Sequence, residues 1–77
     1  MDIPKDAREQ IEKIILKILY NEKAVKSINL LIEKVLAITF EEKITISEKN
    51  VKYIINQMND QKKIQFSQAK GGWRIQI

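Results

Sequence analysis

The sequence predicts an α+β fold in which three helices are followed by a C-terminal β-hairpin. Apolar residues recur at helical spacing in three separate segments, and the period changes from 3.6 to 2 after residue 63. A Gly-Gly pair then separates two alternating segments, as a tight reversal between strands requires. Because 77 residues suffice for one compact domain but not for two, we expect residues 1–77 to form a single domain.

The first helix is expected to begin near Pro4, which suits a first helical turn because its missing N–H would be unpaired there anyway. Asp6 and Glu9 have the three-residue spacing of a capping box. Residues 21–23 break the helical pattern and are expected to form a short connection. The apolar face that defines this helix consists of Ile11, Ile14, Ile15, Ile18 and Leu19.

The second helix is expected to start at Ser27, whose hydroxyl can accept hydrogen bonds from the N–H groups of the following turn. Residues 39–43 lose the periodicity and are expected to form a loop, in which Phe40 either folds inward or projects as a contact residue. Residues 44–46 alternate and carry β-branched side chains, so they could pair as a very short strand. The apolar face of this helix is Ile28, Leu31, Ile32, Val35 and Leu36.

The third helix is expected to follow Ser47, a second good cap, and to end at residues 59–61. Its exposed side gives the candidate binding residues Lys49, Lys52, Tyr53 and Asn56, which share helical spacing. Its inward face is predicted to be Val51, Ile54, Ile55 and Met58.

Two strands should close the domain, the first carrying Ile64 and Phe66 on one side. The second strand should carry Trp73, Ile75 and Ile77 and run to the last residue, with Trp73 in the core. The Trp and Ile side of the hairpin is expected to pack on the first and third helices, because an isolated hairpin is marginally stable. Three helices closed by such a hairpin form a winged helix, a helix-turn-helix with a β-wing.

The charge is unevenly distributed along the chain. Residues 1–42 carry seven basic and eight acidic side chains, whereas residues 43–77 carry seven basic and two acidic ones. A basic C-terminal half favours a nucleic acid or an acidic protein surface as partner. A lysine-rich surface that faces only solvent explains the same composition equally well.

The residue inventory argues against catalysis and against a bound metal or cofactor. The chain has no cysteine and no histidine, so it lacks thiol chemistry, the commonest general base and the commonest metal ligand. We therefore expect no enzyme activity, no cofactor, no metal and no small-molecule ligand. The longest apolar run is four residues and no signal core is evident, so we expect no membrane span and a location in nucleus or cytoplasm.

Binding to DNA is one interpretation of the third helix. It would place that helix in the major groove with Lys49, Lys52, Tyr53 and Asn56, while Lys70 on the wing touches phosphate. The absence of arginine from this face counts against guanine readout, and any amphipathic helix must show polar residues outward.

The chain also resembles the C-terminal winged-helix domain of the cullin family. Residues 15–20, read Ile-Leu-Lys-Ile-Leu-Tyr, match the family's motif in the first helix. Residues 30–36 resemble the second helix, and residues 51–58 with 63–66 fit the third helix and the strand after it. The family also ends shortly after an aromatic-bearing strand, as this chain does at residues 73–77.

One departure from the cullin pattern is that Tyr20 stands where the family carries the lysine that accepts a ubiquitin-like modifier. The resemblance is therefore greatest to the cullin-like scaffold subunit of the anaphase-promoting complex. It implies a non-catalytic scaffold module near the RING subunit and the ubiquitin-conjugating enzyme of a ubiquitin ligase. Apart from the resemblance, we expect Tyr20 to be a packing residue at the end of the first helix. This protein-interaction role is our first interpretation, and a DNA-binding transcriptional regulator is the alternative.

Overall fold

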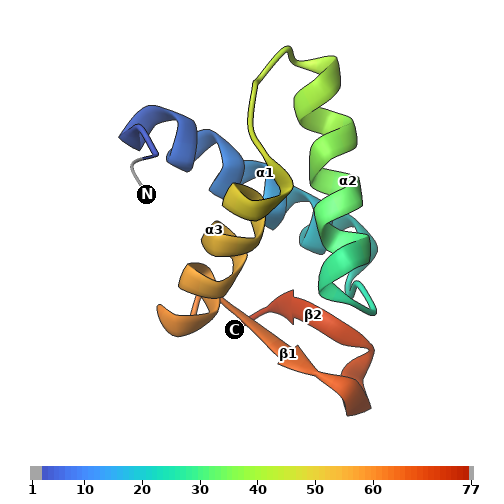
Figure 1. The fold of residues 1–77 in the computed structure, drawn as a ribbon. Coiled ribbons are helices and arrows are strands. Elements are labelled where there is room, and N and C mark those ends of the chain that lie inside the picture. The colour runs from blue at the N-terminus through green and yellow to red at the C-terminus, as the bar shows by residue number, and fades with distance from the viewer. Residues whose placement is uncertain (1–2, 77) are drawn as a thin grey trace.

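In a computed structural model that describes residues 3–76, three helices precede a two-stranded antiparallel hairpin (Figure 1). This arrangement confirms the predicted α+β class. In chain order the elements are α1 (Lys5–Glu22), α2 (Ile28–Glu41), α3 (Glu48–Asp60), β1 (Ile64–Ser67), the 3-10 turn η1 (Gln68–Lys70) and β2 (Gly72–Ile75).

The helix α1 differs from the prediction at both ends. Pro4 immediately precedes its first residue, and no side chain caps that end, so the predicted capping box is wrong. The helix continues to Glu22 and takes in most of the predicted connection. It ends at Lys23, whose positive φ of 71° cannot continue a right-handed helix.

The helix α2 extends into the segment predicted as a loop and ends at Glu41. Residues 39–41 are helical. The buried hydroxyl of Thr39 donates to the carbonyl oxygen of Leu36 at 3.0 Å, so it needs no partner outside the helix. Phe40 consequently projects from a helix, with 85% of its surface exposed. The predicted strand at residues 44–46 is also wrong, since these residues run without a strand partner and pack Ile44 and Ile46 against the core.

Both predicted serine caps are confirmed. The hydroxyl of Ser27 accepts from the N–H of Leu30, and the hydroxyl of Ser47 accepts from the N–H of Asn50, each at 3.1 Å. Each bond satisfies one of the N–H groups that the first turn of a helix leaves without an internal partner. The start of α3, which carries the predicted binding residues, is therefore fixed by Ser47.

Replacing Ser47 with alanine should lower the free energy of unfolding by about 1 kcal/mol, because the N–H of Asn50 loses its acceptor. For a domain of this size the melting temperature should fall by roughly 4–8 °C, which circular dichroism would measure. Ser47→Asp keeps an acceptor oxygen and should melt close to the unmodified protein. Equal losses in the two variants would contradict the capping role.

The hairpin pairs β1 with β2 in register, with Ile64 opposite Ile75 and Phe66 opposite Trp73. The second strand ends at Ile75, short of the predicted end, and Ile77 lies outside the described residues. On its other side β2 makes an isolated antiparallel bridge with Val25, in the connection between α1 and α2. Each N–H of that bridge donates to the opposite carbonyl, at 2.9 Å and 2.7 Å, so β2 lies between two partners.

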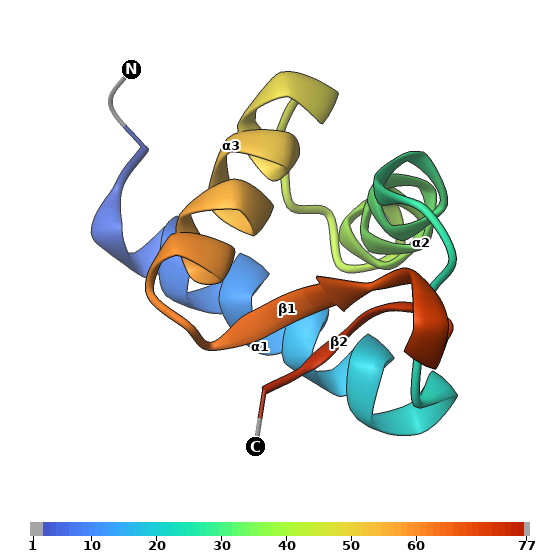
Figure 2. The same cartoon turned by 90° about the horizontal axis from the view of Figure 1, so that it is seen from below.

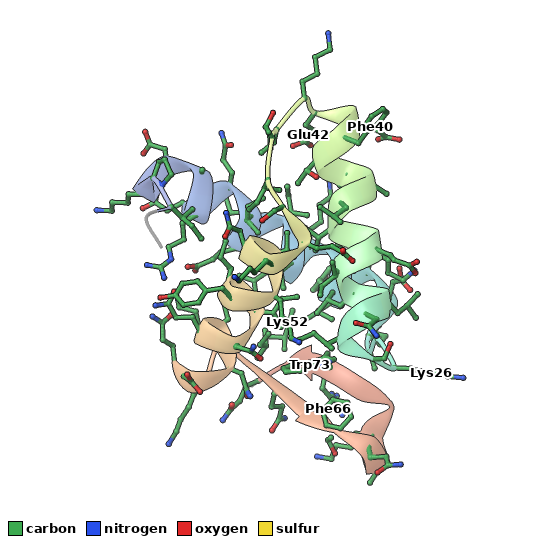
Figure 3. All side chains as sticks on the ribbon, in the orientation of Figure 1. Lys26, Phe40, Glu42, Lys52, Phe66 and Trp73 are labelled. Carbon is green, nitrogen blue, oxygen red and sulfur yellow. The ribbon has the colours of Figure 1, made fainter. Side chains whose placement is uncertain are left out.

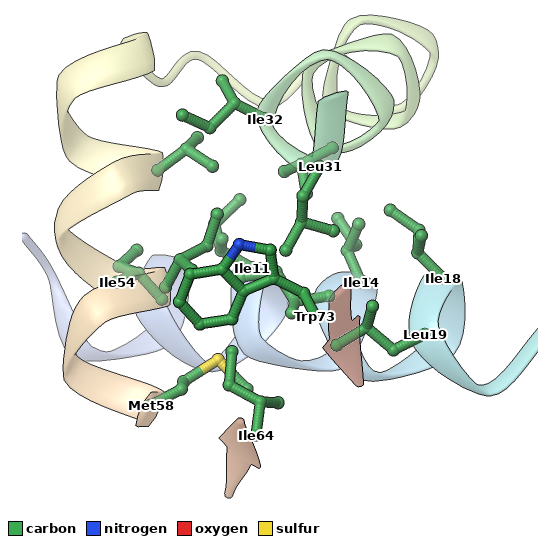
Figure 4. Close-up of a cluster of buried hydrophobic side chains, with 14 of the residues drawn as sticks. Ile11, Ile14, Ile18, Leu19, Leu31, Ile32, Ile54, Met58, Ile64 and Trp73 are labelled. Carbon is green, nitrogen blue, oxygen red and sulfur yellow. The ribbon is translucent and has the colours of Figure 1, made fainter. Parts of the chain in front are cut away.

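Trp73 sits in the middle of the core, as predicted, and is only 7% exposed (Figure 4). Around the indole lie apolar side chains from all three helices and from β1. Seen from below, the hairpin lies across α1 with α3 on one side and α2 on the other (Figure 2). The core contributions from the three helices include Ile11, Ile15, Leu31, Val35, Ile54, Ile55 and Met58.

Candidate functional site

The exposed side of α3 carries four of the predicted binding residues. Because Val51, Ile54, Ile55 and Met58 are buried, the opposite side of the helix must face solvent. Lys49, Lys52 and Asn56 are exposed there, and Tyr53 is 45% exposed. The predicted orientation of the helix is therefore confirmed.

A shallow hollow joins α3 to the N-terminal half of α2. It is lined by Asn29 and Ile32 from α2 and by Glu48, Lys49 and Lys52 from α3. Lys49 and Lys52 therefore border the α2 side of α3, and the start of α2 belongs to the same surface. Figure 3 shows Lys52 between α3 and α2.

A second hollow joins the start of α2 to the end of the hairpin. Its lining consists of Lys26, Phe66, Gln68, Gly71 and Gly72. The fifth predicted residue, Lys70, is exposed at the end of η1, beside this hollow. We call the exposed surface that runs from α3 past the start of α2 to η1 the basic face, defined by Lys26, Lys49, Lys52, Tyr53, Asn56 and Lys70.

Within residues 3–76, the lysines of the basic face are not neutralised by ion pairs. Within residues 3–76 the ion pairs join Glu12 to Arg8 and Lys63, and Glu22 to Lys34, at distances between 2.7 and 4.0 Å. No carboxylate of that part of the chain lies within 4.0 Å of a basic-face lysine, although Glu48 borders the first hollow. The face is therefore positive and suited to a polyanion or an acidic surface.

Two residues of this region were missed by the sequence analysis. Lys26 directly precedes the cap of α2, so its place at a helix start could have been foreseen. Phe66 was predicted only to share one side of its strand with Ile64, and no binding role was assigned to it. It is 49% exposed, although Trp73 opposite it on β2 is buried.

Tyr20 and Phe40 lie outside the basic face. Tyr20 is 71% exposed, and its ring has the ammonium of Lys23 at 5.5 Å from the centroid. Its predicted role as a packing residue is therefore wrong. Phe40 projects away from the body of the domain at the far end of α2 (Figure 3).

Residues 3–76 show neither a metal-ligand cluster nor a membrane-spanning helix. No three His, Cys, Asp or Glu side chains of that range gather as metal ligands. None of its helices is both long enough and apolar enough to cross a bilayer. The arrangement of the basic face can neutralise and orient an anionic partner.

Comparisons of the chain with protein-family models, with curated proteins and with solved structures gave no match. The resemblance to the cullin domain therefore rests only on the residues quoted for it above.

Proposed function

We propose that this chain is a non-catalytic winged-helix module that binds double-stranded DNA through the basic face. The observation that carries the proposal is that four exposed lysines, which form no ion pair within residues 3–76, lie on α3, just before α2 and at the end of η1. Lys49 and Lys52 line a hollow with the first turns of α2. Lys26, just before α2, lines a second hollow with Gln68 and Gly71, which lie on either side of Lys70 in the chain.

The order and pairing of the elements support the winged-helix part of the proposal. The hairpin follows α3 directly, and Val25 between α1 and α2 adds a one-residue strand at the outer edge of β2. In this arrangement α2 and α3 are the helix-turn-helix pair, α3 is the recognition helix, and η1 is the tip of the wing.

The chemistry of the basic face fits a duplex with α3 in the major groove. Lys49 and Lys52 would neutralise phosphates, and an asparagine such as Asn56 can bond both N6 and N7 of adenine. Lys26 stands beside the N-terminus of α2, where free N–H groups and the helix dipole also attract a phosphate. Lys70 would reach the phosphates beside the groove.

The decisive experiment is a fluorescence anisotropy titration of a labelled 20-base-pair duplex at several salt concentrations. If the four lysines each neutralise one phosphate, the plot of log affinity against log salt should have a slope of about −3.5. Affinity should then fall about 100-fold between 50 and 200 mM salt. No saturable binding at 50 mM salt, or a slope near zero, would contradict the proposal.

Amide chemical shifts give an independent readout of where the duplex binds. With labelled protein at physiological salt, shifts should concentrate on residues 47–57 and 68–73 as DNA is added. Shifts confined to α1 would reject the basic face as the DNA site even if binding were saturable.

The exposed aromatic residues outside the basic face favour a second candidate, a protein-interaction module. Tyr20 and Phe40 expose most of their surface, and aromatic residues are enriched in protein interfaces. This candidate covers the cullin-like role near a RING subunit and a ubiquitin-conjugating enzyme. Spectra that stay flat with DNA but respond to a ubiquitin-conjugating enzyme would favour it over the DNA proposal.

A further inference from the structure

We propose that the hollow beside Phe66 holds an unpaired base, so that the domain prefers a duplex end with a single-stranded extension. This inference rests on the proposed DNA binding and names the kind of DNA that is bound. It concerns a residue outside the basic face, next to it on the hairpin.

The ring of Phe66 is exposed but held in place. Phe66 pairs with Trp73 across the hairpin, and the two rings meet edge to face with centroids 5.5 Å apart and planes at 62°. Trp73 is itself buried in the core, so this contact fixes the ring on one side. An aromatic ring that is held on one side and open on the other can stack with a base.

The other walls of the hollow suit a nucleotide. Gly71 and Gly72 have no side chains to fill it, and Gln68 adds an amide that can bond a base edge. Lys26 supplies a positive charge at the rim for the phosphate of the same nucleotide. Figure 3 shows Phe66 on the hairpin and Lys26 at the start of α2.

Because the hollow lies next to the basic face, it favours DNA that has an unpaired base beside a duplex. Lys26 belongs to the basic face and also lines the hollow with Phe66. A DNA strand with a phosphate at Lys26 would therefore place the adjoining base near Phe66. Inside a duplex each base is stacked between its neighbours, and taking it out of the stack costs free energy. A base that is already unpaired avoids that cost.

The test compares a blunt duplex with two extended ones. One carries a four-nucleotide single-stranded extension at its 5′ end, and the other carries it at its 3′ end. The unmodified protein should bind one extended duplex about tenfold more tightly than the blunt one. A 2-aminopurine at the first unpaired position reports stacking directly, because its fluorescence should fall as the protein is added.

Substitutions of Phe66 separate stacking from simple burial. Phe66→Leu keeps apolar contact with Trp73 but removes the π face, so the tenfold ratio should fall to about one. Phe66→Tyr keeps the π face and should retain the ratio. Circular dichroism melting checks that both variants are folded.

The outcomes distinguish this inference from the DNA proposal. Salt-dependent binding with equal affinity for blunt and extended duplexes would overturn the inference and leave the proposed function standing. A preference that persists unchanged in Phe66→Leu would also overturn it. Binding of the extension alone, with none of the blunt duplex, would instead overturn duplex binding and support the hollow.

Discussion

Gly72→Ala is expected to destabilise the domain severely, by about 3–5 kcal/mol. Gly72 has a φ of +117°, which an L side chain rarely adopts, and a Cβ there would lie 2.2 Å from the carbonyl oxygen of Val25. Because this obstacle is backbone, the Val25–Trp73 bridge must open to admit the methyl group. Strain of about 1–3 kcal/mol and two hydrogen bonds of about 1 kcal/mol each give the expected total.

Gly71→Ala is the matched control for this substitution. Gly71 also has a positive φ, of +98°, but a Cβ there meets only the side chain of Ala24, at 3.2 Å. It should cost about 1–2 kcal/mol, mostly from backbone strain. Urea unfolding of both variants measures the difference. If Gly72→Ala were within 1 kcal/mol of Gly71→Ala, the close contact with Val25 would have no energetic importance.

Reversing the charge of Lys49 and Lys52 together should weaken duplex binding about 100-fold at 100 mM salt, since two phosphate contacts become repulsive. The double variant Lys49→Glu/Lys52→Glu should fold normally, because both side chains are exposed and neither forms an ion pair with residues 3–76. Anisotropy titrations measure the affinity, and the melting temperature confirms folding.

The matched control is Lys13→Glu/Lys17→Glu on α1. These lysines are exposed, border a hollow with Gln10, Ile14 and Glu42, and take no part in the ion pairs. Both double variants reduce the net charge from +4 to zero, so a purely general charge effect would weaken binding equally. We expect the α1 variant to lose less than tenfold. Equal losses would show that α3 has no special role.

The helical parts of the fold were predictable because apolar spacing and caps act locally. Ser27 and Ser47 accept from the N–H groups three residues ahead, so their role depends only on neighbouring sequence. The last three residues of α2 were missed because a threonine at a buried position looks like a break in the apolar pattern. Its hydroxyl is satisfied within the helix, and only the three-dimensional structure reveals that bond.

The candidate site was predictable where it lies on one helix and unpredictable where it joins distant segments. The positions of Lys49, Lys52 and Asn56 follow directly from the buried face of α3. The pairing of Val25 with β2 was not predictable, because a single residue between two helices shows no strand pattern. This pairing brings Lys26 next to the hairpin. Strand alternation likewise puts Phe66 and Ile64 on one side of β1, but it does not specify that Ile64 is buried while Phe66 is 49% exposed.

The bridge between Val25 and Trp73 also bears on how the domain folds. It joins residues 48 positions apart, so closing it carries a loop-entropy cost that local helix formation does not. During synthesis α1 and α2 can form early, yet β2 cannot dock until residue 73 has left the ribosome. The late-arriving strand contributes Trp73 to the centre of the core. The helices alone would then be a loose intermediate, and the surface that joins α2 to the hairpin would be the last part of the molecule to be assembled.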